Sequence, residues 1–268
     1  MKTVHIGCGA GFSGDRFDAA LPILEDMKSR KGPCYLVYEV LAERTLALAQ
    51  VQRRKNPILG CSPYLENYLR LSLAQAHAQN VRIVSNLGAA HATLKLAHEL
   101  GLKGIKIAVV TGDDLLTTHA PDKLRSFETM EGIAIPDQPL VAANAYLGAR
   151  PIAQALATDT DIVLVGRTTD SALFLGPLIH EFGWAEDAFD HLAAGTICGH
   201  LLECGGQVSG TYFADPGFKD VPDLANAGFP IAEMNADGKL TITKPSNTGG
   251  MVSQRSSCVC RRNTSPRS

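Results

Sequence analysis

Glycines with the spacing of a phosphate-binding loop follow the first apolar run of the sequence. The segment is Gly9-Ala10-Gly11-Phe12-Ser13-Gly14. Glycines permit a tight turn against a pyrophosphate at a helix start, and a later glutamate can accept a hydrogen bond from a ribose hydroxyl. Asp15 opposes this reading because it repels a phosphate and can cap the helix itself. The candidate anion-binding residues are Gly9, Gly11, Ser13, Gly14, Arg16 and Glu39.

Three interpretations of this loop remain open. It forms an NAD(P) site, a site for another anion such as a CoA phosphate or a carboxylate, or a structural glycine turn.

Carboxylates, an arginine and small polar residues follow the later apolar runs. The rigid fork of an arginine binds a carboxylate or a phosphate, and a carboxylate can transfer a proton. Capping of the next helix is the alternative role for each aspartate. The candidate catalytic residues are Asp113, Arg167 and Asp170, and the candidate binding residues in these turns are Asn86, Gly88, Gly112 and Ser171.

Other kinds of reaction find little support. Asp113 and Asp114 with His119 offer oxygen and imidazole ligands, but adjacent carboxylates point in different directions, so we predict no metal site. His200 and Glu203 lie one helical turn apart, which predicts a structural pair. The sequence contains no nucleophile elbow, Walker loop, zinc cysteine cluster or H-E-x-x-H helix. This disfavours hydrolases and nucleoside triphosphatases.

Short apolar strands must position these residues. Continuous runs such as Ile162-Val163-Leu164-Val165 are typical of a parallel sheet that is covered on both faces. The predicted strands are Thr3–Gly7, Cys34–Glu39, Val81–Ser85, Ile105–Thr111 and Asp161–Gly166. The predicted helices are Phe17–Ser29, Ala42–Arg54, Pro63–Gln79, Ala92–Leu100, Pro121–Met130, Arg150–Ala157, Asp170–Phe182 and His191–Cys204. Their alternation indicates a doubly wound α/β fold with a mostly parallel sheet and helices on both faces.

Glycine, proline, aspartate and asparagine become dense after residue 204. We predict an α/β core domain at 1–204 and an extended, turn-rich C-terminal segment of the same domain at 205–253. The only strand-like pieces in that segment are Gln207–Tyr212 and Leu240–Thr243. Residues 254–268 carry four arginines and no acidic residue, and we predict a disordered or aberrant tail there.

The ends of the predicted strands should share one cleft. In a parallel sheet all carboxyl ends lie at the same edge, and ligands bind outside that edge. We therefore expect convergence of Ser13, Arg16, Asn86, Asp113, Arg167 and Asp170. Arg167 would anchor an anionic substrate there, while Asp113 or Asp170 moves a proton.

The composition bounds the class of protein. The 268 residues are 45% hydrophobic and 19% charged, and the net charge of −2 without a basic stripe argues against nucleic acid as a partner. No apolar run reaches the ~18 residues of a membrane span, and none near the N-terminus suits a signal peptide. Seven scattered cysteines fit a reducing compartment. We expect a cytoplasmic protein with a small-molecule substrate and no membrane partner.

Several segments together resemble one known family. They are Ile6–Arg16, Tyr38–Thr45, Ile83–Ala90, Val110–Asp114, Ala143–Ala149, Gly166–Leu173 and Ala193–Pro230. In this order they resemble the N-terminal domain of the acyclic terpene utilisation (AtuA) family over residues 1–253. The resemblance implies a role in the bacterial breakdown of acyclic terpenes or branched acyl-CoA compounds. It also implies that relatives continue past Ser253 into a smaller ferredoxin-like domain, so we interpret the tail as the result of a frameshift or truncation.

We therefore predict an enzyme, or a subunit of one, that acts on a branched acyl-CoA or a related carboxylate. A hydration or lyase-type proton transfer is favoured because the turns carry carboxylates and an arginine but no evident nucleophile. A CoA thioester is the expected substrate, with NAD(P) the less favoured ligand. The alternatives are an NAD(P)-dependent oxidoreductase that uses Gly9–Gly14, and a non-catalytic binding or scaffold subunit. A homo-oligomer or a companion subunit is compatible with each.

Overall fold

A sheet of seven strands forms the centre of the protein, whose computed structural model describes residues 2–56 and 60–257. The strand order is β4-β5-β3-β2-β1-β6-β7. The parallel strands are β1 (Thr3–Ala10), β2 (Cys34–Tyr38), β3 (Arg82–Ser85), β4 (Ile107–Val110) and β5 (Ile162–Val165). Two antiparallel strands, β6 (Ile231–Asn235) and β7 (Leu240–Thr243), extend the sheet beyond β1. The predicted α/β class with a mostly parallel sheet is confirmed.

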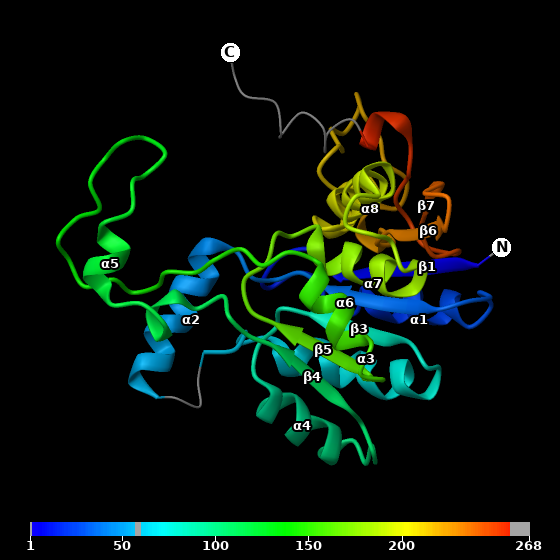
Figure 1. Cartoon of the computed structure of the whole chain (residues 1–268). Coiled ribbons are helices and arrows are strands. Elements are labelled where there is room, and N and C mark those ends of the chain that lie inside the picture. The colour runs from blue at the N-terminus through cyan, green and yellow to red at the C-terminus, as the bar shows by residue number, and fades with distance from the viewer. Residues whose placement is uncertain (1, 57–59, 258–268) are drawn as a thin grey trace.

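Helices cover both faces of the sheet, as the continuous apolar runs predict (Figure 1). One face carries α1 (Ala20–Met27), α3 (Leu65–Ala78) and α4 (Ala90–Glu99), which pack on a core that includes Leu36 and Ile83. The other face carries α6 (Arg150–Leu156), α7 (Ala172–Phe182) and α8 (Phe189–Leu202), which pack on Val37 and Val163. Every residue of β2 and β5 is buried. The fold is therefore doubly wound.

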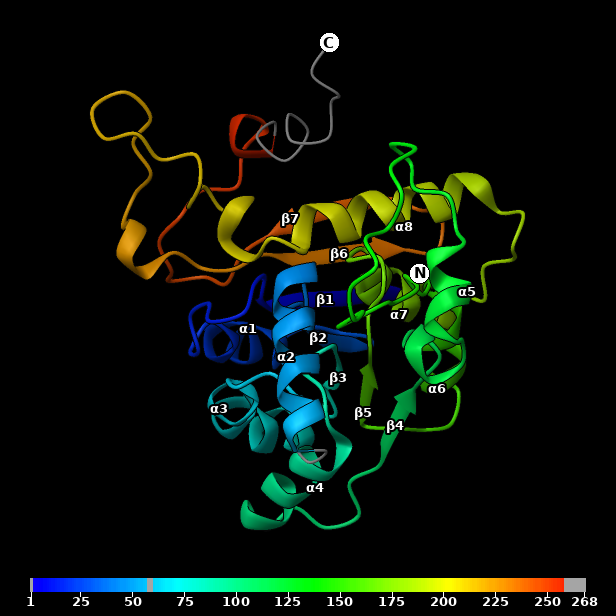
Figure 2. The ribbon, with the colours of Figure 1, turned by 90° about the vertical axis from the view of Figure 1, so that its left-hand side faces the viewer.

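Helix α2 (Glu43–Lys55) and a long excursion after β4 stand away from this body (Figure 1). No residue of α2 is buried. Residues 111–149 form the excursion, which carries the short helices η1 (Leu115–Thr117) and α5 (Pro121–Arg125). An isolated bridge between Asp114 and Asn144 closes its base, and Gln50 of α2 donates a hydrogen bond to Asp114 at 3.2 Å. Figure 2 looks toward the edge of the sheet at which α2 lies.

The region after residue 204 differs from the prediction in two strands. Gln207–Tyr212 is not a strand, because Gly205–Gln207 forms a short 3₁₀ helix, η2, and turns follow it. Gly205 and Gly210 have φ of +57° and +99° there, in the left-handed region that glycine adopts readily. Strand β6 was not predicted, although it pairs with β1 from Thr3 to Gly7. The turn-rich segment thus contributes two strands to the main sheet.

The first four residues of the predicted tail, 254–257, form a helical turn in which Ser256 is buried. Its hydroxyl donates a hydrogen bond to the Met251 carbonyl oxygen at 3.1 Å. Residues 258–268 of that prediction lie outside the described residues.

None of the helices within 2–56 and 60–257 is long and apolar enough to cross a lipid bilayer.

Candidate functional site

The sheet has a topological switch point between β3 and β5, which are neighbours. The chain leaves β3 toward α4 on one face, and leaves β5 toward α7 on the other. Diverging connections of this kind open a crevice at the carboxyl ends of the strands, where α/β proteins bind ligands. Glu39, Asn86 and Arg167 follow directly after β2, β3 and the β5 turn. The candidate site is therefore built around this point.

Arg167 holds three segments together at the centre of the site. Its side chain is only 3% exposed, and Nη1 donates hydrogen bonds to the Leu41 carbonyl oxygen at 2.7 Å and to Asp170 Oδ1 at 2.6 Å. Nη2 donates to Glu43 Oε1 at 3.2 Å, and the guanidinium lies 4.2 Å from the ring centre of Tyr146. Both ends of its fork are thus used within the protein, which makes Arg167 a positioning residue.

Glu39 is a buried carboxylic acid that directly follows β2. Burial raises its pKa to about 7, and the nearby charge of Asp170 adds to the increase, while Asn86 and Arg167 act in the opposite direction. Oε1 accepts hydrogen bonds from Asn86 Nδ2 at 2.9 Å and from the Leu41 amide at 3.3 Å. No hydrogen bond to Oε2 occurs in the part of the chain that the structure describes. A group that titrates near neutral pH can act as either acid or base.

Asn86 fixes the orientation of Glu39. Its Oδ1 accepts a hydrogen bond from the Val40 amide at 2.8 Å, while its Nδ2 donates to Glu39. Both ends of the Asn86 side-chain amide are therefore hydrogen-bonded to the two residues that follow β2. The sequence predicted Asn86 as a binding residue, whereas in the structure its side-chain amide is hydrogen-bonded to Glu39 and to the Val40 amide.

Asp113 locks the turn after β5 onto the end of β4. Its Oδ2 accepts hydrogen bonds from the Arg167 amide at 2.8 Å and from Asn144 Nδ2 at 2.9 Å. A Cβ on Gly166 would lie 2.2 Å from the same carboxylate, so a larger residue there would displace the Asp113 side chain from this position. Asp114 instead accepts from the Leu116 amide and caps η1. The two adjacent carboxylates thus have separate structural partners.

A second protonatable pair reaches the site from α8. His200 Nδ1 and Glu203 Oε1 lie 2.9 Å apart, as their spacing predicts. Burial raises the pKa of Glu203 and the charge of Asp170 raises it further, whereas His200 lowers it. This electrostatic link to Asp170 joins α8 to the turn after β5. Sequence reasoning did not include Glu203 in the site, nor Glu43 or Tyr146, which hold Arg167.

Side chains of the protein itself contact the glycine loop, among them the Asp15 carboxylate and the Tyr38 ring. The Gly11 amide donates to Asp15 Oδ2 at 3.0 Å, and the Arg16 amide donates to Asp15 Oδ1 at 2.8 Å. A Cβ on Gly9 would lie 2.6 Å from the Tyr38 ring, and Gly14 has a φ of +88° beside Tyr64. Helix α1 begins only at Ala20, so the glycines do not lie at a helix N-terminus. The geometry favours the structural glycine turn.

The expected convergence is partial. The structure brings Asn86, Asp113, Arg167 and Asp170 together with Glu39. Arg16 instead donates to Asp18 Oδ1 at 2.7 Å and to the Ala227 carbonyl oxygen at 3.1 Å, beside the segment that leads into β6. Ser13 lies on the same loop as Arg16.

The remaining candidates are turn residues. Gly88 has a φ of +111° and packs against Cys61, and Gly112 has a φ of +115° with open space around it. Ser171 is the N-cap residue of α7, and its backbone approaches Gly199 of α8 so closely that a Cβ there would lie 2.6 Å away. These three positions shape the crevice through the backbone.

Replacing Gly11 with alanine should destabilise the protein. The new Cβ would lie 2.3 Å from Gly205 N and 2.7 Å from the Glu203 carbonyl oxygen, and backbone atoms cannot rotate aside. We expect a loss of about 1–3 kcal/mol in thermal or chemical denaturation. Gly148→Ala is the control, because a Cβ there meets nothing within 4 Å. Equal stability of the two variants would contradict the close packing. Lost ligand binding in Gly11 variants would not by itself identify a phosphate site.

Two pockets are lined by residues that follow the parallel strands. One of about 400 Å³ is lined by Gly88, His91, Asp113 and Gly166 on the β4 side. The other, of about 230 Å³, is lined by residues that include Cys204, the neighbour of Glu203. A small molecule can therefore reach Asp113 and the turn after β5 through the first of these pockets.

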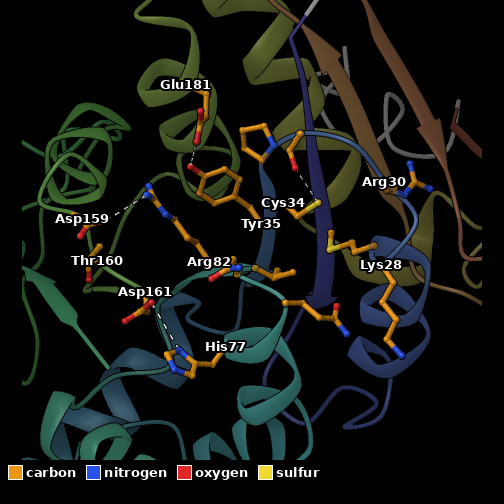
Figure 3. Close-up of a pocket in the computed structure, with 16 residues that line it drawn as sticks. Lys28, Arg30, Cys34, Tyr35, His77, Arg82, Asp159, Thr160, Asp161 and Glu181 are labelled. Atoms are coloured by element: carbon orange, nitrogen blue, oxygen red, sulfur yellow. Dashed lines mark hydrogen bonds and ion pairs between the residues drawn. The ribbon is translucent and has the colours of Figure 1, made fainter. Parts of the chain in front are cut away.

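Another pocket, of about 600 Å³, lies at the opposite edge of the sheet, where β2 and β3 begin. Figure 3 shows Arg82 turned toward Asp159 and His77 turned toward Asp161. The distances are 2.5 Å for Tyr35–Glu181, 4.0 Å for Arg82–Asp159 and 3.8 Å for His77–Asp161. Because this edge is the amino end of the parallel strands, whereas α/β proteins bind ligands at the carboxyl ends, we centre the candidate site on the switch point.

Glu39 should make stability fall as pH rises. Its pKa is about 7 in the folded protein against an ordinary 4.5, so between these values the folded protein holds a proton that the unfolded chain has released. The free energy of unfolding should fall by about 3 kcal/mol as pH rises from about 4.5 to about 7 and then level off. Glu39→Gln cannot ionise and should lack this fall in urea denaturation. The same pH dependence in both proteins would contradict the raised pKa.

Within the described residues, no group of three or more histidine, cysteine, aspartate or glutamate side chains is arranged to hold a metal ion.

The chain was compared with known protein families, curated proteins and solved structures. The family model described as acyclic terpene utilisation family protein AtuA matches residues 4–260, which reaches past Ser253 into the predicted tail. No curated protein and no solved structure matches the chain.

Proposed function

The chain belongs to the acyclic terpene utilisation family AtuA, which gives it a role in acyclic terpene utilisation, and from this premise we propose that it is an enzyme, or an enzyme subunit, that moves a proton on a branched acyl-CoA or a related carboxylic acid derivative. Hydration of a carbon–carbon double bond, or its reverse, is the reaction class that this chemistry supports best.

The observation that carries this proposal is the Glu39 carboxyl group. It is buried at the switch point, its pKa is raised to about 7, and one of its oxygens makes no hydrogen bond among the described residues. A general base works best when its pKa lies near the working pH, and such catalysis contributes about 10²–10⁴ in rate. A solvent-exposed glutamate would be a far weaker base at the same pH.

The three nearby carboxyl groups have different environments, which suits an exchange of roles. Asp170 is held by the Arg167 guanidinium at 2.6 Å, and burial raises the pKa of Glu39 and of Glu203. Two acids that hold their protons more strongly than usual can serve one as base and the other as acid. Glu39 in its ionised form would accept a proton, and protonated Glu203 would donate one.

A thioester substrate fits this chemistry. The thioester carbonyl acidifies the C–H bonds of the neighbouring carbon, so a carboxylate can remove a proton there and leave an enolate. In a hydration, water adds across the double bond conjugated to that carbonyl, one carboxylate takes a proton from the water, and one carboxylic acid protonates the carbon. Atoms and charges then balance without an oxidant.

Nicotinamide-dependent oxidation has weaker support. It would use the Gly9–Gly14 loop, where the Gly11 amide already donates to Asp15 and Gly11 packs on the backbone of Cys204 and Gly205.

Exchange of substrate hydrogen with solvent tests the proposal. The protein is incubated in deuterated water with branched and linear acyl-CoA thioesters, saturated and α,β-unsaturated, and mass spectrometry then measures deuterium or water incorporation. We expect incorporation at the carbon next to the thioester, with a rate that depends on an ionisation near pH 7. No incorporation into any thioester, with binding intact, would refute the assignment.

A further inference from the structure

We infer that two copies of this chain form a closed dimer, in which the tip of the excursion of each copy docks on the outer face of α2 of the other. The tip lies beyond α5 and consists of Phe127, Glu128, Met130 and Ile133. The outer face of α2 carries a row of side chains that we call the stripe, namely Arg44, Leu48, Val51 and Lys55.

The tip exposes large apolar side chains to water. Phe127, Met130 and Ile133 are 50%, 102% and 68% exposed, and Figure 1 shows the loop beyond α5 projecting away from the sheet. Glu128, between the first two of them, is also exposed. Large apolar side chains that gather in one exposed segment are typical of a protein–protein contact. The tip therefore offers an apolar surface with an acidic group beside it.

The stripe lies along one side of α2. Its four residues follow one another at spacings of four, three and four, which places them on the same side of an α-helix. Leu48 and Val51, in the middle of the stripe, are 56% and 37% exposed. A helix of about 12–15 residues depends on packing for most of its stability, yet none of the 13 residues of α2 is buried. The stripe is thus open to a partner that would stabilise the helix.

The opposite side of α2 is held by the base of its own excursion. Gln50 donates a hydrogen bond to Asp114 at 3.2 Å, and Arg53 lies 3.4 Å from the same carboxylate. Arg54 donates to the Leu140 carbonyl oxygen. At 100° per residue these three side chains of α2 lie on the side away from the stripe. Because the tip of the same copy leaves the stripe exposed, we assign the stripe to the tip of a second copy.

The two segments are complementary in charge and in polarity. Helix α2 carries four basic residues and one acidic residue, whereas residues 111–149 carry six acidic and two basic residues. Their net charges of +3 and −4 attract each other, and such complementarity selects the partner and the register of docking. The apolar side chains of the tip can cover Leu48 and Val51, while Glu128 meets a cation of the stripe. One chain therefore holds both halves of the contact.

A two-fold axis makes this contact twice. Each copy offers one tip and one stripe, so a symmetric dimer uses both and leaves neither open. A standard interface takes about 20–30 residues from each partner, and α2 together with the excursion from residue 111 to residue 149 can supply them. Val109 of the edge strand β4 adds apolar surface next to α2, since it is 53% exposed and lines a pocket together with Arg53.

Sedimentation of the full chain tests the dimer. Analytical ultracentrifugation over a series of concentrations measures the dissociation constant for the wild type, Leu48→Asp and Met130→Asp. Both positions are exposed, so the variants should keep the fold, which circular dichroism checks. Leu71→Asp, at a 45% exposed apolar position of α3, is the matched control.

We expect the wild type and Leu71→Asp to form dimers of equal affinity. Leu48→Asp and Met130→Asp should each raise the dissociation constant at least about tenfold, because a carboxylate then faces an apolar surface at the centre of the contact. A wild type that stays monomeric at every concentration would overturn the inference, and so would a dimer that neither substitution weakens.

Cross-linking shows which surfaces meet. Leu48→Cys and Met130→Cys proteins are mixed and treated with a short bis-maleimide, and mass spectrometry identifies the linked peptides. We expect a link between residues 48 and 130, which in this mixture joins two different molecules. A mixture of Leu71→Cys with Met130→Cys should link no more than the wild type, whose native cysteines give the background. A dimer without the link between 48 and 130 would refute the exchange of tips.

Discussion

Replacing Glu39 with glutamine should slow proton exchange on a thioester substrate by about 10²–10⁴. Glutamine has nearly the same shape and can still accept the hydrogen bonds that Asn86 and the Leu41 amide donate to Glu39 Oε1. It cannot take up or release the proton. The fold and the affinity for substrate should therefore be retained, and the rate, measured by deuterium incorporation, should fall.

The pH profile separates this chemical role from a structural one. In the wild type, exchange should rise with pH through about 7, where Glu39 becomes a carboxylate, and the residual exchange of Glu39→Gln should lack that rise. Glu131→Gln, in the exposed excursion, is the control and should match the wild type. A Glu39→Gln variant that keeps the rise would assign the ionisation to another acid.

Replacing Arg167 with methionine should destabilise the protein by about 3 kcal/mol, the lower end of the cost of breaking a buried pair. Asp170 and Glu43 lose their cation and the Leu41 carbonyl loses a donor, although both acids are partly exposed and regain some hydration. The melting temperature should fall by roughly 6–12 °C. Arg150→Met is the control: its exposed pair with Glu186 contributes at most about 1 kcal/mol.

A double variant distinguishes lost pairing from lost packing. Arg167→Met alone leaves the charge of Asp170 unpaired, and Asp170→Asn removes that charge. The losses in free energy of unfolding of the two single variants should therefore add up to at least about 1 kcal/mol more than the loss in the double variant. Simple additivity would mean that the ion pair between Arg167 and Asp170 does not contribute to the stability.

The parallel half of the fold could be predicted because its strands are buried on both faces. Runs such as Ile162–Val165 consist only of large apolar residues, which is typical of a strand that is buried on both faces. Strand β6 was missed because Pro230 and Asn235 bound it closely and Glu233 interrupts its apolar residues. Arg30 pairs with Glu233 from the other end of the chain, and a distant partner of this kind leaves no local signal.

The proximity of four candidate residues could be predicted, but not their contacts. The rule that ligands lie at the carboxyl ends of strands predicted that Asn86, Asp113, Arg167 and Asp170 converge, and the structure brings these four together; that they form a ligand site stays a prediction. Their roles depend on partners far away in sequence, such as Tyr146 and Glu43 for Arg167. Glu39 was considered as a ribose acceptor. Its raised pKa arises from burial and from Asp170, neither of which can be derived from the residues around Glu39.

The antiparallel pairing of β1 with β6 has a consequence for how the chain is made. Thr3 pairs with Asn235, so on the ribosome the first strand waits roughly 10–50 s for its outer neighbour at a synthesis rate of ~5–20 residues per second. During that time one side of β1 presents unpaired backbone groups, which invite pairing with another nascent chain. Slower initiation, which spaces the ribosomes along the message, should therefore raise the soluble yield of this protein.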